Sequence, residues 1–283
     1  MNEATSSNAA WQPDARKSRE ITERTAPEDP FPDTIINVLQ GTEGLCAELP
    51  VAPDVEDPQV LRRLHDTPER FKIRLANSEG RRSAASYLIH KRYSWRGYMP
   101  ADSTETNAAA ERPHGVTLVA SDDDKALATI SVGFDSPDGL LVDALYGGEV
   151  DELRRNGARL CEFTKLAVET GERSREVLAM IFHIAYMYAR RLHDCTDLLI
   201  EVNPRHVRFY RAALGFEVCG PERTCPRVNA PAVLLRLDLA QCERQIGLYG
   251  GHREMADKMR SLYPLAFSPD EEAGICGRLR QLG

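Results

Sequence analysis

The chain has 283 residues, 42% of them hydrophobic, and a formal net charge of −7 at pH 7. The acidity is concentrated in residues 1–60, which hold twelve acidic and four basic residues, whereas the rest of the chain holds 32 basic and 31 acidic ones. This nearly neutral remainder argues against generic nucleic-acid binding, which needs a basic surface. The length allows one large core plus a small appendage.

Seven scattered cysteines without a CxxC pair indicate reduced thiols and no zinc site. The first residues, MNEATSSN, lack the basic and apolar regions of a signal peptide. The longest apolar run, residues 177–189, is 13 residues long, whereas a membrane-spanning helix needs about 20. The sequence therefore predicts a cytoplasmic protein without a transmembrane segment.

Residues 1–60 are rich in Pro, Ser, Asn, Glu and Asp, a composition typical of disorder. Within them we expect one short helix, at residues 35–39. The segment 71–76, FKIRLA, alternates apolar and basic residues, which predicts a half-buried strand. Residues 83–98 suit a helix with an aromatic and basic face, closed by Pro100.

Residues 116–120 and 126–134 form a predicted hairpin across a turn of one Ser and three Asp. A helix at 144–156 is expected to end at Gly157.

A strand at 160–168, an apolar helix at 174–193 and a strand at 197–202 follow in the order of a parallel βαβ unit. A helix at 204–213 and a strand at 232–239 complete a mixed α/β sheet with helices on both faces. No GxGxxG follows any strand, which argues against a Rossmann domain.

The sequence thus predicts three parts. Residues 1–60 form an acidic, mostly disordered segment, residues 61–240 form the main domain, and residues 241–283 form a helical tail that packs on this domain.

The segment 161–168, CEFTKLAV, places an acid and a base three residues apart in an apolar strand. Buried charges are costly, so Glu162 and Lys165 must be paired or face a cleft. Simple alternation puts the two side chains on opposite faces of the strand. They share one site only if the phase shifts between them, and we expect a β-bulge or splay at residues 163–166. The alternative is that both are rim charges or an ordinary ion pair.

The helix after this strand offers weaker candidates. His183 fits a core histidine better than a base. The backbone N–H groups at the helix start, with Arg173 and Arg175, could hold a phosphate, although both arginines could equally be solvated. The large side chains of the helix fit a core better than a ligand site: Met180, Tyr186, Met187 and Tyr188.

The segment 203–216, NPRHVRFYRAALGF, places Tyr210 on a short helix after a strand end. Its hydroxyl could give a proton to a leaving thiolate, or the ring could simply pack in the core. Arg208 and Arg211 of the same helix are expected to face solvent.

In this order the two motifs resemble the GCN5-related N-acetyltransferase (GNAT) superfamily. Residues 203–216 are similar to its second signature, in which Asn is followed seven residues on by Tyr and then by Gly-Phe. The resemblance implies a GNAT-like acyl-CoA N-acyltransferase fold, whose mixed central sheet has a splayed parallel strand pair with a pantetheine arm in the gap. The loop that holds the pyrophosphate of coenzyme A there is missing, since residues 170–175 read TGERSR.

Within this superfamily, the chain looks closest to the long-chain N-acyl amino acid synthases of the FeeM type, which are related to acyl-homoserine lactone synthases. Residues 162–165, EFTK, resemble the Glu-x-Ser-Arg motif of acyl-homoserine lactone synthases, with Lys in place of Arg. The matching segments lie within residues 70–240: FKIRLA at 71–76, Arg92-Tyr93, Gly97-Tyr98, Leu153-Arg154 with Gly157, residues 162–168, Pro204-Arg205-His206 and Phe209-Tyr210.

This resemblance implies a bacterial acyltransferase that moves a long-chain acyl group to the amine of an amino acid. The co-substrate would be the acyl thioester of acyl carrier protein or of coenzyme A, with no bound cofactor or metal. The missing pyrophosphate loop favours the carrier protein. An acyl-homoserine lactone synthase-like enzyme and a non-catalytic acyl-binding module remain as alternatives.

The resemblance also suggests site residues. Glu162 would take a proton from the attacking amine, and Tyr210 would protonate the departing thiolate. Arg74, with Lys165 second, is favoured for the substrate carboxylate because a guanidinium binds a carboxylate through two hydrogen bonds. The expected thioester-binding residues are Leu166, Ala167 and Val168, through their backbone, with Arg173 and Arg175. The expected pocket walls are Tyr93, Trp95 and Tyr98.

An acidic carrier protein would dock on a basic surface. The arginines near the apolar helix are candidates for that surface, although a solvated charged face is the commoner fate of such residues: Arg154, Arg155, Arg173, Arg175, Arg190 and Arg191.

Overall fold

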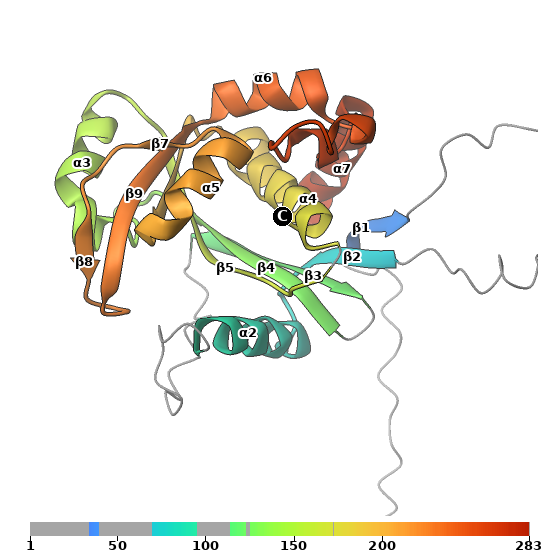
Figure 1. Ribbon diagram of the computed structural model, residues 1–283, viewed down its shortest axis with the longest axis horizontal. Helices are drawn as coiled ribbons and strands as arrows, with labels where there is room; N and C mark the ends of the chain where they lie inside the picture. The colour runs from blue at the N-terminus through green and yellow to red at the C-terminus, as the bar shows by residue number, and fades with distance from the viewer. Residues whose placement is uncertain (1–33, 40–69, 95–113, 123–124, 172, 283) are drawn as a thin grey trace, which may run out of the picture. The chain divides into compact units, whose positions relative to one another are not determined.

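The computed structural model describes residues 34–39, 70–94, 114–122, 125–171 and 173–282, all within one compact unit, residues 33–283. This part forms a nine-stranded sheet with the order β1-β2-β3-β4-β5-β6-β9-β7, and β8 pairs with β9 (Figure 1). In the described residues, no helix combines the length and the apolar character that crossing a membrane requires.

The first five strands are antiparallel neighbours: β1 (Thr34–Leu39), β2 (Arg70–Leu75), β3 (Gly115–Asp122), β4 (Lys125–Phe134) and β5 (Leu160–Val168). Strand β6 (Asp197–Val202) runs parallel to β5. The strands that follow are antiparallel to their neighbours: β7 (Glu217–Val218), β8 (Arg223–Cys225) and β9 (Ala230–Asp238). This mixed sheet with one parallel pair confirms the expected fold class.

Helices cover both faces of the sheet (Figure 1). On one face lie α2 (Glu79–Ser94), whose Ala85 packs against β3, and α3 (Asp143–Arg155), whose Tyr146 and Val150 pack against β5, β6 and β9. The elements on the other face share the main core: α4 (Ser174–Tyr186) with its π-helical continuation (Met187–Leu192), α5 (Pro204–Leu214), α6 (Leu239–Tyr249), the short 3-10 turn Tyr263–Leu265 and α7 (Pro269–Leu282).

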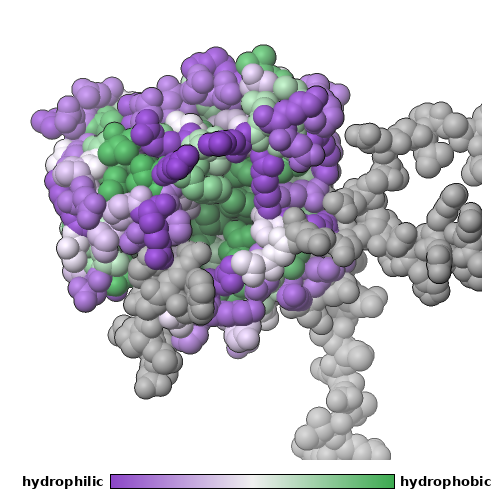
Figure 2. Space-filling view, viewed as in Figure 1, coloured by the Kyte–Doolittle hydropathy of each residue, from purple (hydrophilic) through white to green (hydrophobic). Residues whose placement is uncertain are grey.

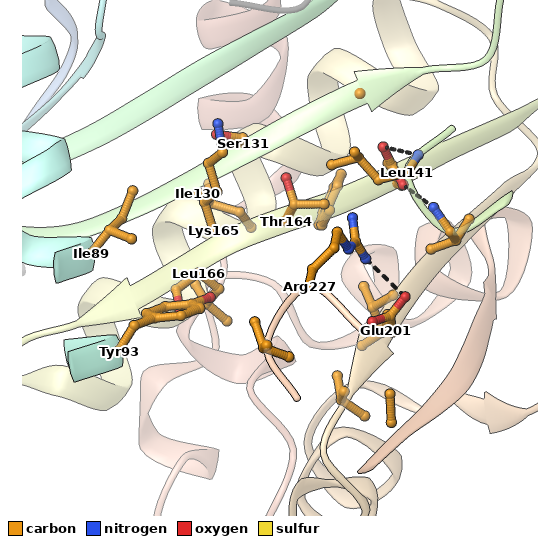
Figure 3. A pocket seen from close by; sticks show the side chains of 18 of the residues that line it. Ile89, Tyr93, Ile130, Ser131, Leu141, Thr164, Lys165, Leu166, Glu201 and Arg227 are labelled. Carbon is orange, nitrogen blue, oxygen red and sulfur yellow. Dashed lines mark hydrogen bonds and ion pairs between the residues drawn. The ribbon is translucent and has the colours of Figure 1, made fainter. Parts of the chain in front are cut away.

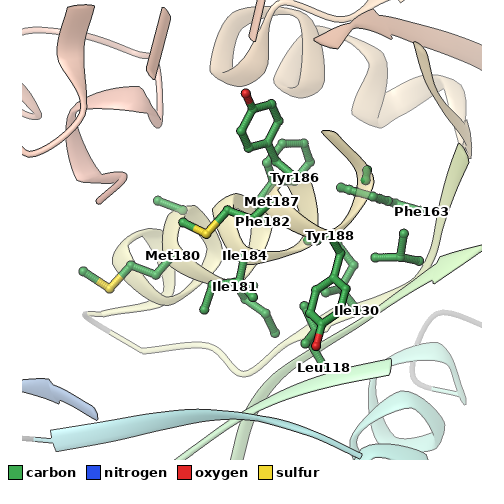
Figure 4. Close-up of a cluster of buried hydrophobic side chains, with 14 of the residues drawn as sticks. Leu118, Ile130, Phe163, Met180, Ile181, Phe182, Ile184, Tyr186, Met187 and Tyr188 are labelled. Carbon is green, nitrogen blue, oxygen red and sulfur yellow. The ribbon is translucent and has the colours of Figure 1, made fainter. Parts of the chain in front are cut away.

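Helix α4 is the centre of this core, and its side chains pack on Leu118 and Ile130 of the sheet (Figure 4). His183 is buried, with Nδ1 accepting from the Phe267 backbone N–H at 3.1 Å and Nε2 lying 3.2 Å from Glu272. It is therefore a satisfied core histidine, as predicted. The four large side chains assigned to the core from the sequence are buried too: Met180, Tyr186, Met187 and Tyr188.

The segment at 35–39 is a strand and not the short helix expected there. It belongs to β1, which pairs antiparallel with β2 and buries Ile35 in the main core. So short an apolar run cannot sustain a helix on its own, whereas the edge of β2 offers it backbone partners. Strand β1 also precedes the domain boundary expected at residue 61. The rest of the segment expected to be disordered lies outside the described residues.

Strand β5 departs from regular pairing on both of its edges. Its pairing with β6 extends only from Leu160 to Glu162, so the two strands part after Glu162. On its other edge, Thr164 pairs with Ser131 and Ala167 with Thr129, which leaves two β5 residues opposite Ile130 alone. This is the β-bulge expected at residues 163–166.

Candidate active site

A cavity of about 660 Å³ lies where β5 and β6 part. Tyr93 of α2 and Phe182 of α4 both line it, although these helices cover opposite faces of the sheet. The cavity therefore passes through the sheet at the splay. On the face seen in Figure 2, hydrophobic surface lies recessed within a rim of hydrophilic side chains.

Glu162 projects into this cavity, although only 1% of its surface is exposed. Oε1 accepts a hydrogen bond from the backbone N–H of Leu141 at 2.8 Å, and Oε2 accepts one from that of Val142 at 3.1 Å (dashed lines beside Leu141 in Figure 3). The start of α3 thus holds the carboxylate by both oxygens. A carboxylate oxygen can accept more than one hydrogen bond, so these backbone contacts do not prevent the group from meeting a ligand.

Glu162 lies close to a glycine in the neighbouring strand. Gly133 pairs with Glu162 across β4 and β5, and a Cβ atom there would lie 3.1 Å from both Cγ and Oε1 of the glutamate. A side chain at this position would make the Glu162 side chain shift by a few tenths of an ångström.

Lys165 lines the same cavity as Glu162, so the bulge brings the two charged residues to one site. Its φ of +54° is a left-handed value, uncommon for a residue other than glycine. The next residue, Leu166, lines the cavity too, and its carbonyl accepts a hydrogen bond from the Tyr93 hydroxyl at 3.4 Å. This contact joins α2 to the bulged strand.

Helix α5 contributes Tyr210 to the cavity wall. Asn203 caps the helix, with its side chain accepting from the Arg205 N–H at 3.2 Å, and Gly215 ends it with a φ of +82°. The Tyr210 ring packs edge-on against Phe216, with centroids 5.7 Å apart. The ring therefore contacts the core and faces the cavity.

Several residues expected at the site lie elsewhere. Arg74 sits on β2, paired with Val119 of β3, and does not line the cavity. Ala167 and Val168 continue the ladder with β4 beyond the cavity. Trp95 and Tyr98 lie outside the described residues.

The arginines at the start of α4 make internal contacts. Arg175 donates to the backbone carbonyls of Ala256, Met259 and Ser261, and so ties α4 to the C-terminal tail. The Arg173 guanidinium lies over the Phe71 ring, 5.0 Å from its centroid. Neither arginine lines the cavity.

The basic surface expected near α4 is largely neutralised. Arg190 and Arg191 pair with Glu243, and Arg191 also pairs with Glu272. Arg154 is bound by three carboxylates: Asp135, Asp143 and Asp151.

Two polar pairs in the cavity were not anticipated from the sequence. The hydroxyls of Thr117 and Ser131 lie 2.8 Å apart, and Arg227 pairs with Glu201. Glu201 stands in the apolar strand DLLIEV, the same kind of signal that singled out Glu162. Arg227 lies in a turn, where an arginine carries no such signal.

A parallel strand pair that parts beside a buried carboxylate, in a mixed sheet with helices on both faces, is the arrangement expected of a GNAT-type acyltransferase fold. The family model described as N-acyl amino acid synthase FeeM matches residues 84–238, and the chain belongs to this family. It is therefore an acyltransferase of the N-acyl amino acid synthase type.

The solved structure of FeeM from uncultured soil microbes is similar to this chain, with 27% identity, 62% of this chain and 93% of FeeM covered, and a TM-score of 0.56. An acyl-CoA N-acyltransferase from Pseudomonas aeruginosa matches with 14% identity, coverage of 59% and 97%, and a TM-score of 0.42. The AHL synthase LasI matches with 12% identity, coverage of 60% and 90%, and a TM-score of 0.42. A comparison with curated proteins found no match.

Proposed function

We propose that the protein transfers a long-chain acyl group from the thioester of an acyl carrier protein to the amine of an amino acid. The observation that carries this proposal is the buried carboxylate of Glu162 in a cavity that opens where β5 and β6 part. We also propose that it does so in a bacterial cytoplasm, which the free thiols of its six described cysteines support.

The reaction needs a base because an ammonium ion has no lone pair with which to attack. Glu162 takes its proton, directly or through one water, and the amine nitrogen then attacks the thioester carbonyl carbon. The carbon–sulfur bond breaks, the thiolate receives a proton from the Tyr210 hydroxyl, and the Tyr210 phenolate regains one from the nitrogen as the amide forms. Glu162 then releases its proton to solvent. The ladder between β5 and β6 ends at Glu162. Backbone N–H groups of β5 beyond this point polarise the carbonyl oxygen.

The cavity suits an acyl chain. Its volume falls within the range of about 300–1,000 Å³ typical of ligand pockets. Most of its wall is apolar, with side chains from both faces of the sheet: Ile89, Val116, Ile130, Val132, Phe163, Phe182, Ile200 and Val202.

Hydrogen bonding at the start of α4 favours a carrier protein over free coenzyme A. The pyrophosphate of coenzyme A would require cations or open N–H groups here. The Gly171 N–H already donates to the Ser174 hydroxyl at 2.9 Å, and Arg175 donates to the backbone carbonyls of Ala256, Met259 and Ser261. Beside the cavity, α5 exposes Arg208 and Arg211, which suit an acidic partner.

The purified full chain tests this proposal when it is incubated with acyl-loaded carrier protein or acyl-CoA and with each proteinogenic amino acid. We expect mass spectrometry to detect N-acyl amino acids, at a higher kcat/KM with the carrier protein. A lactone product, or acyl binding without turnover, would refute the function. Equal efficiency with acyl-CoA would refute the proposed donor.

Glu162→Gln tests the base. We expect the variant to fold and kcat to fall about 10²-fold or more, because the amide cannot take the amine proton. The amide also leaves one of the two backbone donors of Glu162 without an acceptor, so the free energy of unfolding should fall by about 1–3 kcal/mol. Raising the pH should partly restore the rate, since the amine then loses its proton to solvent.

Asp143→Asn is the matched control. The Asp143 carboxylate accepts from the Leu140 N–H at 2.6 Å and pairs with Arg154 at 2.7 Å, so this change weakens the loop that holds Glu162 without removing the carboxylate proposed as the base. If Asp143→Asn lost as much activity as Glu162→Gln, the glutamate would serve to hold the loop and not to take the proton.

A further inference from the structure

One ion pair in the cavity has no part in the chemistry above. Arg227, in the turn between β8 and β9, donates from Nη2 to Oε2 of Glu201 on β6 at 3.0 Å (Figure 3). Both residues line the cavity, and their side chains are 42% and 11% exposed, respectively. A charged pair in a mostly apolar cavity contributes little to stability, because desolvation offsets the attraction between the charges.

The Arg227 guanidinium keeps donors for a ligand. It has five N–H donors, of which one is directed at Glu201 and another meets the Cys225 thiol, so that further donors remain. Burial alone would lower the pKa of Arg227, but the Cys225 thiol and the Glu201 carboxylate raise it above its usual value. Arg227 is therefore a permanent cation in the wall of the cavity.

The register of the sheet places this pair on the same side as Glu162. Glu162 pairs with Leu199 across β5 and β6, and Glu201 lies two residues further along β6. Alternation along the strand puts Leu199 and Glu201 on one face, about 7 Å apart, on the face to which Glu162 points. An α-amino acid with its nitrogen at Glu162 would direct its carboxylate toward Arg227.

We infer that Arg227 binds the carboxylate of the acceptor amino acid, and that Glu201 is a positioning residue that holds the Arg227 guanidinium in the cavity. This inference rests on the proposed function, and it makes the acceptor class α-amino carboxylates as opposed to simple amines or amides. Arg227 thus takes the carboxylate-binding role expected for Arg74, which does not line the cavity. A planar guanidinium also matches a carboxylate better than the point charge of Lys165 does.

Acceptor kinetics test this subsite. The substrates are the proteinogenic amino acids, each beside its α-carboxamide, with a fixed acyl donor. We expect the wild type to prefer each acid to its amide. Arg227→Gln should raise the KM for the acids about 10- to 100-fold and abolish the preference, whereas Arg227→Lys should retain part of it.

Glu201→Gln should raise the acceptor KM less than Arg227→Gln does, and leave kcat and the donor KM unchanged, because Glu201 acts only through Arg227. If kcat fell instead, Glu201 would not be the positioning residue inferred here.

The matched control is Arg236→Gln. Arg236 on β9 donates from Nε to Asp197 on β6 at 2.6 Å, and these side chains are 39% and 6% exposed, but they do not line the cavity. This variant should keep the wild-type ratio of acid to amide. Arg227→Gln with a wild-type ratio, or Arg236→Gln with a lost one, would overturn the assignment.

Calorimetric titration of the amino acids separates this inference from the proposed function. Binding to the wild type that is lost in Arg227→Gln supports the subsite even if no N-acyl product forms. Equal binding to both proteins overturns the subsite even if the wild type is an active acyltransferase.

Discussion

Lys165 combines a positively charged side chain with a left-handed backbone, at φ +54°. This conformation costs an L-residue roughly 1–2 kcal/mol, and the cost is greatest for a β-branched residue. The bulge that it forms turns β5 so that Glu162 and Lys165 face one cavity. The strain is therefore located where the strand leaves its regular register.

The backbone requirement at position 165 can be tested separately from the charge. Lys165→Gly should leave the free energy of unfolding unchanged or raise it by up to about 1 kcal/mol, since glycine adopts a positive φ without strain. Lys165→Val should lower it by about 1–2 kcal/mol. Urea unfolding measures both, and equal stability of the two variants would contradict a left-handed residue in the bulge.

Single site residues could be predicted from the sequence where their type is unusual for the surrounding segment. Glu162 and Lys165 are charged residues in an apolar strand, and the bulge was predicted because only a shift of phase could bring both to one site. Arg227 could not be predicted in this way, because arginine is common in turns. Its place in the cavity depends on how β8 and β9 fold back over β6, which no local pattern encodes.

Among the elements, β5 (Leu160–Val168) and β6 (Asp197–Val202) have the bounds expected from the sequence. Their apolar runs are continuous because both faces are covered. Strands β7 and β8 were missed because they are two and three residues long and exist only by pairing with β9. Strand β1 was misread as a helix for the same reason, since its structure depends on a distant partner.

The C-terminal tail is joined to α4 by a buried acid. Glu272 of α7 accepts from Arg191 Nε at 2.7 Å and lies 3.2 Å from His183 Nε2. Burial raises the pKa of Glu272, but the bonds from His183 and Arg191 outweigh it, so that the pKa lies below the usual value of 4.5. The folded state thus favours the ionised carboxylate.

We expect Glu272→Gln to lower the free energy of unfolding by about 1.5–3 kcal/mol at pH 7. Because the folded pKa is depressed, the stabilisation is complete above pH 4.5 and is lost as the pH falls through the folded value. The wild type and the variant should therefore converge in acid.

Urea unfolding between pH 7 and pH 3 measures this difference. Glu243→Gln is the control, since Glu243 also pairs with Arg191 but is 33% exposed, and its loss should cost less than about 1 kcal/mol. If the difference in free energy of unfolding between the wild type and Glu272→Gln does not depend on pH, the shape of the Glu272 side chain and not its charge stabilises the packing of the tail.

The distribution of unpaired arginines over the molecule decides where an acidic partner could dock. The arginines expected to receive a carrier protein are mostly engaged, by carboxylates at Arg154, Arg190 and Arg191 and by backbone carbonyls at Arg175. On α5, by contrast, Arg208 and Arg211 are exposed and make no ion pair within the described part of the chain. Sequence alone could not separate these groups, because pairing depends on tertiary contacts.

The exposed arginines of α5 lie within one or two residues of Tyr210, which lines the cavity. A carrier protein docked there would have a short path for its pantetheine arm into the splay. We therefore expect the double change Arg208→Glu with Arg211→Glu to lower kcat/KM about 10-fold or more with an acyl carrier protein donor, and more so at low salt.

A small donor, acyl-N-acetylcysteamine, separates docking from chemistry, because it enters the cavity without touching a protein surface. Its kcat/KM should not change in the double variant. Arg244 on α6 is exposed and donates hydrogen bonds to Gln241, and Arg244→Glu should leave kcat/KM unchanged with both donors. An equal fall with both donors would locate the defect in the cavity. No fall with either donor would mean that the carrier protein approaches over another surface.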